Sequence, residues 1–444
     1  MTMFHHSIIV LAVIIAAFAA GKKYLLTTEL AMFVSALAGL AAHMVLPKGV
    51  DPRSPLMLAE TIRHIVEGTF TYFDVCLIFL TATFFMALYK EAGGVAFIVR
   101  KIVRTFHARR FVCLLLLVLV MLAPGAITGS GATAVLTVGS LVGSVLLAMG
   151  VTEDRRTALI FLLAAMSAAC PPINLWAMMA AAGANMPYVG FAKPLAVLSI
   201  TGALISAFWL AGKGKPVDLE KAMSELPEAP EGWNWPRAMF PFVLLSILVL
   251  GGRFLPYSFP VLGLPLIFMA SALSVLLVSP VKPAVFRVAS TTVSNLLGLV
   301  GIMIVVGALI QIMTLSGVRG LLSLAVVTLP LAVLFSTLWL ILPISEGMLQ
   351  YAVAPLIGVP LIMLFNMKGL DPVISLAAWS VMWPLGDCLP PTAVVGRAAV
   401  MELDYRGDYF RGFVRTTLVP MAAILFLCTL FMVYSKELSG LIGG

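Results

Sequence analysis

The segment 111–150 reads FVCLLLLVLVMLAPGAITGSGATAVLTVGSLVGSVLLAMG, and its three parts decide the fold that we predict. Two apolar arms of about 14–16 residues each flank the small-residue centre GAITGSGATA at 125–134. As helices the arms rise only about 21–24 Å, which is short of the ~30 Å hydrocarbon core of a bilayer. We therefore expect a re-entrant hairpin here, with a single kinked helix pair as the alternative.

Basic residues beside this segment indicate the face to which the hairpin opens. Before it lie Arg100, Lys101, Arg104, Arg109 and Arg110, and after it lie Arg155 and Arg156. Because Lys and Arg accumulate in cytoplasmic loops, we expect both flanks on the cytoplasmic side. The corresponding region at 331–369 has only two basic residues near its ends, Arg319 and Lys368. So few basic residues are compatible with an inverted copy that opens to the outside.

One constant offset relates the residue numbers in the two halves of the chain. Pro124, Gly150 and the pair Pro171–Pro172 recur as Pro343, Gly369 and Pro390–Pro391, so that the offset is 219 in every case. Paired helix-breaking segments at matching places point to a transporter whose binding site lies between repeats. We predict an all-α polytopic membrane protein with two inverted repeats, each holding a re-entrant hairpin and a Pro-Pro broken helix, as in an elevator-type carrier. The repeats are 1–212 and 238–444, and the polar segment 213–237 links them, with Trp233 and Trp235 suited to the headgroup region.

The composition supports insertion into a membrane. Of the 444 residues, 61% are hydrophobic and only 11% are charged, whereas a typical soluble domain has about 25% charged residues. We attribute the formal charge of +8 to loop topology, and so expect a lipid bilayer and no nucleic acid as the partner. The five cysteines are expected to be small buried residues. The first apolar segment is expected to be a retained helix, with a cleaved signal peptide as the alternative.

Non-helical backbone at membrane depth must be buried in protein or line a wet cavity, and four segments are candidates. The first is the tip around Thr128, Gly129, Ser130, Gly131 and Thr133, whose hydroxyls and carbonyls are hard oxygen ligands for a small cation. The second is CPPIN at 170–174, where two prolines free earlier carbonyls beside Asn174. The alternatives are tight packing of small residues at the tip and a simple kink at CPPIN.

The other two segments lie in the second half and carry ionisable groups. Glu346 follows Pro343 by three residues, and Asp387 precedes Pro390 by three. Because charged residues inside membrane segments are costly, they mark functional sites by default. We expect Glu346 and Asp387 to coordinate a cation or couple a proton, and Arg397 to bind a carboxylate substrate. The alternatives are a structural ion pair of Arg397 with one of these acids, or a place for Arg397 in the loop that ends its helix.

No catalytic motif accompanies these segments. The histidines are scattered, and HExxH, paired CxxC, Walker and GxSxG sequences are all missing from the chain. We therefore expect neither an enzyme nor a transition-metal site, and no cofactor other than sodium as the coupling ion. A membrane enzyme or a channel is the hypothesis from another class, and it would require a catalytic dyad or a repeated pore ring.

Three stretches resemble one known family. PGAITGSGATAVLTVG at 124–139, CPPINLWAMMAAAGANMPYVGF at 170–191 and GLDPVISLAAWSVMWPLGDCLPPTAVVG at 369–396 are similar to the large membrane subunit of tripartite ATP-independent periplasmic (TRAP) transporters. That family belongs to the ion-transporter superfamily, and the resemblance covers nearly the whole chain. It implies sodium sites at the hairpin tips and broken helices, at Thr128, Gly129, Ser130, Gly131, Asn174, Ser345, Glu346, Gly347, Asp387 and Thr392. The second tip, ISEGMLQ at 344–350, departs from the glycine-rich tip of the family.

The resemblance also implies how the protein works and with what partners. It implies sodium-coupled uptake of an organic acid across the bacterial cytoplasmic (inner) membrane, with a periplasmic substrate-binding protein and a small membrane subunit. We expect the substrate between Ser130, Asn174 and the break near Pro390, with Arg397 as a further contact. The alternative is a stand-alone carrier of the same superfamily for dicarboxylate, citrate or another anion.

Overall fold

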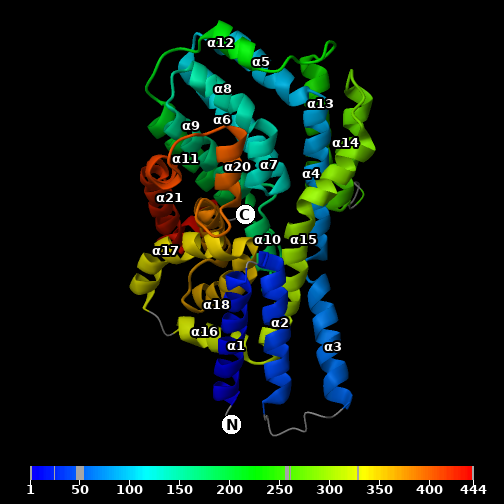
Figure 1. Cartoon of the computed structure of the whole chain (residues 1–444), viewed down its shortest axis with the longest axis vertical. Helices are drawn as coiled ribbons and strands as arrows, with labels where there is room; N and C mark the ends of the chain where they lie inside the picture. The colour runs from blue at the N-terminus through cyan, green and yellow to red at the C-terminus, as the bar shows by residue number, and fades with distance from the viewer. Residues whose placement is uncertain are drawn as a thin grey trace.

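The structure is a computed structural model that describes residues 3–24, 26–46, 55–255, 260, 262–327 and 330–442. Within these ranges the chain forms helices and no strands (Figure 1). Ten of the described helical segments are long and apolar enough to cross a membrane. The chain is therefore an all-α polytopic membrane protein, as its sequence predicts.

One group of helices, which we call the scaffold, combines elements from both halves of the chain. It contains α1 (Met3–Lys23), α2 (Thr28–Val45), α3 (Pro55–Phe70), α4 (Phe73–Glu91), α13 (Trp235–Phe254), α14 (Leu264–Val278) and α15 (Val285–Leu315). The 31-residue helix α15 packs against α2, α3 and α4, and α14 packs against α4. Several of these helices run along the long axis of the molecule (Figure 1). Gly68 of α3 and Gly307 of α15 allow the two backbones to touch, because a Cβ on Gly307 would lie 2.0 Å from the Gly68 carbonyl oxygen.

The second group, which we call the hairpin body, contains the segments predicted to form the two hairpins and the two broken helices. The first arm is longer than expected, because the helix Arg110–Thr128 has 19 residues and is long enough to cross a membrane, so the re-entrant course stays a prediction. The first half of the hairpin body is α6 (Arg110–Thr128), α7 (Gly131–Ala134), η1 (Val135–Gly139), α8 (Ser140–Ala148), α9 (Glu153–Ala169), α10 (Leu175–Gly183) and α11 (Ala192–Ala211). Its second half is α17 (Leu331–Leu349), η2 (Gln350–Ala352), η3 (Ala354–Gly358), α18 (Val359–Met367), α19 (Pro372–Met382), η4 (Trp383–Gly386), α20 (Val394–Glu402), η5 (Tyr409–Val414), α21 (Arg415–Val433) and α22 (Ser435–Ile442). Helix α9 is buried along nearly its whole length, and it contacts α6, α11, α20 and α21.

Element boundaries in the hairpin body recur at the offset seen in the sequence. The π-helical turns η1 and η3 are related by that offset at both ends, and so are α8 and α18, and α10 and α20. Gly150 and Gly369, which end the second arms, have φ of 75° and 74°. The offset therefore holds for backbone conformation as well as for residue type.

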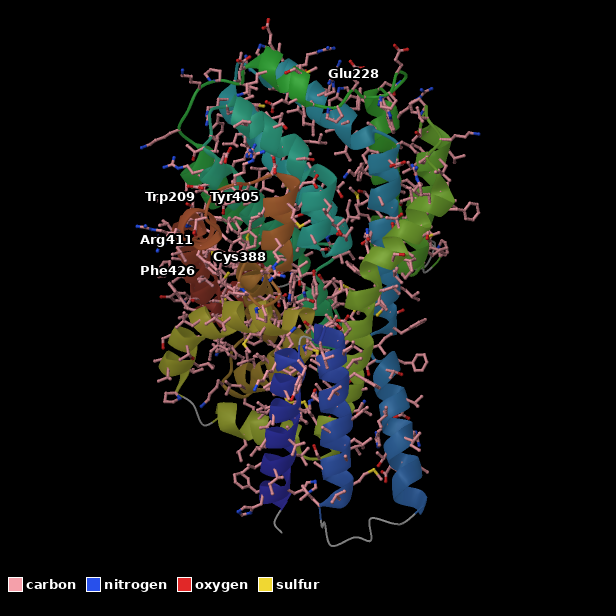
Figure 2. All side chains as sticks on the ribbon, viewed as in Figure 1. Trp209, Glu228, Cys388, Tyr405, Arg411 and Phe426 are labelled. Atoms are coloured by element: carbon pink, nitrogen blue, oxygen red, sulfur yellow. The ribbon has the colours of Figure 1, made fainter. Side chains whose placement is uncertain are left out.

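Two short helices connect the groups, and the linker lies across one of them. They are α5 (Gly94–Phe106), which leads into α6, and α16 (Val318–Val327), which leads toward α17. In the linker, α12 (Leu219–Glu225) packs against α5 and α8, and the Arg100 guanidinium donates to the Leu226 carbonyl at 2.7 Å. Glu228 of the linker lies at the same end of the molecule as α5 (Figure 2).

Side-chain burial corrects one detail of the linker and confirms one expectation about the cysteines. Trp233 is not exposed to a headgroup region, because the residue is only 8% exposed and its Nε1–H donates to the Ala92 carbonyl at 2.9 Å. Trp235 is 43% exposed, and its place in the headgroup region stays a prediction. All five cysteines are buried and without disulfides, as expected for small apolar side chains.

Candidate binding site between the scaffold and the hairpin body

A cavity of about 740 Å³ lies between the scaffold and the hairpin body. On the scaffold side its wall comes mainly from α4 and from the first half of α15. On the hairpin side it comes from the first tip at Ser130–Thr137, from Gln350 and Tyr351, and from the second break between Asp387 and Arg397. The two tips and the second break, which are distant in sequence, thus meet at one cavity.

The first tip is held in shape by its own hydroxyls. The Thr128 hydroxyl donates to the Pro124 carbonyl at 2.8 Å, and it accepts from the Ser130 amide at 3.2 Å. Gly129 has φ of 70°, the left-handed conformation that glycine adopts without a Cβ penalty. A Cβ on Gly131 would lie 3.0 Å from the Ala164 carbonyl oxygen of α9. Ser130 and Thr133 line the cavity, whereas Thr128, Gly129 and Gly131 do not.

The first broken helix supports this tip from behind. The Ile173 amide donates to the Ala126 carbonyl at 3.1 Å, so the break is hydrogen-bonded to the hairpin. The Asn174 side chain is fully buried, and it caps α10 by accepting from the Ala177 amide at 2.9 Å. Its Nδ2 donates to the Ala169 carbonyl at 3.0 Å. Asn174 therefore fills the break that the two prolines create, and it does not line the cavity.

The second tip is fastened to the second break. The Gly347 carbonyl accepts from the Thr392 hydroxyl at 2.8 Å and from the Thr392 amide at 3.1 Å. Glycine is required at the contact, since a Cβ on Gly386 would lie 1.8 Å from the Pro343 carbonyl oxygen. The Ser345 hydroxyl is turned back to the Leu342 carbonyl at 2.8 Å. The chain leaves this tip at Gln350, which has a positive φ of 54° and a ψ of −145°.

Glu346 is the most deeply buried acid of the site. Its side chain is fully buried, and its Oε2 accepts from the Trp176 Nε1–H at 2.8 Å. Its other oxygen, Oε1, has no hydrogen-bond partner within the described residues. The Trp176 ring stacks on Tyr351 with 4.6 Å between centroids, and the Tyr351 hydroxyl donates to the Gly129 carbonyl at 3.3 Å. Glu346 thereby joins the second tip to the first broken helix, and Tyr351 joins it to the first tip.

Asp387 and Arg397 flank the second proline pair. Asp387 lines the cavity, is only 3% exposed, and accepts from the Val394 amide at 2.8 Å through Oδ1. Arg397 lies in the first turns of α20 and not in a loop, and its guanidinium donates to the Pro391 carbonyl at 3.1 Å. Across the described ranges no ion pair joins Arg397 to either acid. Cys388, next to Asp387 in the chain, lies near the middle of the molecule (Figure 2).

The scaffold wall of the cavity contains both basic and acidic side chains. Arg287 of α15 forms an ion pair with Glu91 of α4. The Lys90 ammonium donates to the Leu136 carbonyl of the first hairpin, and the Lys22 ammonium donates to the Thr28 hydroxyl at 3.3 Å. These cations are thus engaged with protein oxygens, whereas among the described residues Arg397 donates only to the Pro391 carbonyl of its own segment.

The predicted residues fall into two sets. The cavity is lined by Ser130, Asp387, Thr392 and Arg397. Behind its wall lie Thr128, Gly129, Gly131, Asn174, Ser345, Glu346 and Gly347.

Sequence reasoning missed the polar residues of the scaffold wall. Thr291, Thr292 and Asn295 of α15 line the cavity. The sequence does hold a signal for them, because TTVSN at 291–295 is a polar cluster at the start of a long apolar helix. Sequence reasoning also missed Trp176 and Tyr351. The sequence signal for these two residues is an aromatic side chain with a polar atom that follows shortly after a helix break.

Comparison with known proteins shows the fold and leaves the family open. No protein-family model matches the chain, and no curated protein does. Among solved structures it is similar to MtrF of Neisseria gonorrhoeae, described within a class of antimetabolite efflux pumps, with a TM-score of 0.62 and 13% identity over 91% of this chain and 94% of that one. It is also similar to the YdaH transporter of Alcanivorax borkumensis, whose topology is described as unusual, with a TM-score of 0.64 and 13% identity over 88% of this chain and 91% of that one.

These matches correct the reading of the resemblance to TRAP transporters. Both solved structures share the fold of the chain, and neither is described as a TRAP subunit. The chain thus shares the fold of these two proteins, and the assignment to a TRAP large subunit finds no support in these comparisons.

Proposed function

We propose that this chain is a secondary transporter that uses the energy of a sodium gradient to move an organic anion across the membrane. The observation that carries the proposal is the cavity between the scaffold and the hairpin body, into which both tips and the second break project. The shared fold with two transporters supports it. The proposal involves no chemistry on the substrate.

The charge of Arg397 supports an anionic substrate. Its guanidinium lines the cavity and has one hydrogen bond, to a backbone carbonyl, so most of its donors are available to a ligand. A guanidinium binds a carboxylate through two parallel hydrogen bonds. The Ser130 hydroxyl lies on the same wall, and its proton is available because its oxygen accepts from the Thr133 amide, so it can complete the recognition of a carboxylate group.

The acids support cation coupling. Asp387 lines the cavity, and the Oε1 atom of Glu346 is buried without a partner among the described residues. Carboxylate, hydroxyl and carbonyl oxygens are the ligands that small hard cations prefer. We propose that sodium is held near Asp387, Thr392 and the tip carbonyls, and that the hairpin body moves against the scaffold in the manner of an elevator.

Uptake and export are the two directions to be distinguished. Uptake follows from the resemblance stated above, and it brings with it the prediction of a periplasmic binding protein and a small membrane subunit in a bacterial cytoplasmic membrane. Export is the second candidate, because MtrF is described within a class of efflux pumps.

The test is transport by the purified chain in proteoliposomes. We expect accumulation of a radiolabelled dicarboxylate only when sodium is imposed on one side, and no accumulation when choline replaces sodium. Activity of the chain alone would favour a stand-alone carrier, whereas activity only with a binding protein and small subunit would favour the tripartite system. Transport that is indifferent to sodium would refute the coupling.

Variants separate substrate from cation. Arg397→Gln should raise the KM for a dicarboxylate at least tenfold, and Arg397→Lys less, because the bidentate contact is lost in both but the charge only in the first. The matched control is Arg411→Gln, since Arg411 is on the periphery of the hairpin body (Figure 2). Ser130→Ala and Asn174→Ala test the first half, and unaltered sodium dependence and KM in both would exclude those residues from the site.

A further inference from the structure

A second cavity, of about 700 Å³, lies on the other side of the first hairpin from the candidate site and is bordered by α4, α5, α6 and α13. Three of these helices contribute one face each. The faces are Val95, Ile98 and Ile102 of α5, Leu116, Leu119, Val120 and Ala123 of α6, and Trp235, Met239 and Phe242 of α13. Such spacings of three, four and seven residues mark a single side of a helix. The groove is therefore lined by three apolar helix faces, on which Leu119 and Trp235 are 49% and 43% exposed and Val95 and Ile102 are buried.

The groove extends over most of the thickness of one leaflet of a bilayer. From Leu116 to Ala123 helix α6 rises about 11 Å, and Pro124 at the deep end is next to the hairpin tip. One leaflet of the ~30 Å hydrocarbon core is about 15 Å thick. The depth of the groove thus suits an acyl chain that enters from the membrane surface.

The mouth of the groove is cationic. Among the lining residues Lys101 is the single charged one, and Thr105 lies one turn after it on α5. Within the described residues the Lys101 ammonium has no ion pair or hydrogen bond, whereas the neighbouring Arg100 is engaged with the carbonyls of Leu226 and Pro227. Trp235 also borders the groove and packs against α5, and indole rings favour the headgroup level.

We propose that this groove binds a phospholipid with an anionic headgroup, whose acyl chain lies along α6 and whose phosphate meets the Lys101 ammonium. The polarity of the groove supports this occupant, because it is apolar in depth and basic at the mouth, as an anionic lipid requires. The basic residues around α5 also place this end at the cytoplasmic leaflet by the positive-inside tendency, and anionic lipids give that leaflet its surface potential. The site is independent of the proposed substrate.

The experiment is native mass spectrometry of the delipidated chain with phosphatidylglycerol and with phosphatidylcholine of the same acyl chains. We expect tighter binding of phosphatidylglycerol, and Lys101→Gln should weaken it about fivefold while leaving phosphatidylcholine unchanged. Lys282→Gln is the matched control, because Lys282 is an exposed lysine outside the groove. It should change neither lipid.

A second variant tests the apolar part. Ala123→Leu fills the deep end of the groove and should weaken both lipids, while size-exclusion and thermal-unfolding profiles report that the variant is folded. Equal binding of the two lipids by the parent chain, or an equal loss in Lys101→Gln and Lys282→Gln, would overturn the proposal. A lipid-free dimer that Ala123→Leu dissociates would also overturn it, in favour of a second copy as the occupant.

Discussion

Gly386→Ala should separate the second hairpin from the second broken helix. The new Cβ would lie 1.8 Å from the Pro343 oxygen, 2.4 Å from its carbonyl carbon and 2.6 Å from its Cα. All three are backbone atoms of α17, so no side-chain rotation relieves the contact. One backbone must therefore move until the 1.8 Å separation has opened to the 3.4 Å of an ordinary contact. That movement breaks the hydrogen bonds between Gly347 and Thr392.

The cost follows from two effects. Overpacking costs about 1–3 kcal/mol, and each of the two hydrogen bonds contributes about 1 kcal/mol, so we expect a loss of about 3–5 kcal/mol. The assay is thermal unfolding in detergent, where the midpoint should fall by roughly 5 °C. The control is Gly320→Ala in α16, because nothing lies within 4 Å of the added Cβ. An unchanged midpoint in Gly386→Ala would refute the close contact.

Three further variants test other parts of the structure. Arg110→Ala should lower the free energy of unfolding by about 2–4 kcal/mol, as measured by thermal unfolding. The reason is that the Arg110 guanidinium donates to the carbonyls of Met149, Ala211, Lys213 and Lys215. The control is Arg109→Ala, which should have little effect because Arg109 is adjacent and exposed. Glu346→Gln should keep the free energy of unfolding within about 1 kcal/mol of the parent's, since the shape of the side chain is retained. It should nevertheless abolish the sodium dependence of transport in proteoliposomes. If the sodium dependence is retained, Glu346 is not part of the coupling site. Tyr405→Phe should cost about 1–2 kcal/mol in the same unfolding assay, because the hydroxyl donates to the Asp154 carboxylate at 2.5 Å; a midpoint equal to the parent's would show that this contact is dispensable.

The breaks in the helices could be predicted because proline and glycine act locally. Pro171–Pro172 and Pro390–Pro391 cannot continue a helix, and the structure ends α9 at Ala169 and begins α20 at Val394 around them. The composition likewise predicts the bundle of membrane-spanning helices, since apolar segments of this length can cross a bilayer only as helices or as strands of a closed barrel.

The orientation of side chains around the breaks could not be predicted in the same way. Asn174 and Thr128 are polar residues beside a break, which favours a ligand role, but the structure uses their hydrogen bonds to cap and close the backbone. The pairing of Glu346 with Trp176 joins residues 170 positions apart, and no local pattern reports such a contact. The scaffold wall was missed for a similar reason, because its polar cluster faces the cavity only when α15 packs against α4.

The π-helical turns Val135–Gly139 and Ala354–Gly358 bear on the order of two events in the evolution of this chain, the gain of one residue and the duplication of the half. Their sequences, VLTVG and APLIG, share only the final glycine, yet both turns begin and end at the constant offset between the halves. A π turn holds one residue more than an α turn, so losing that residue from one copy would rotate the rest of its arm by about 100°. The simplest history is that a half-length ancestor gained the residue before its gene doubled.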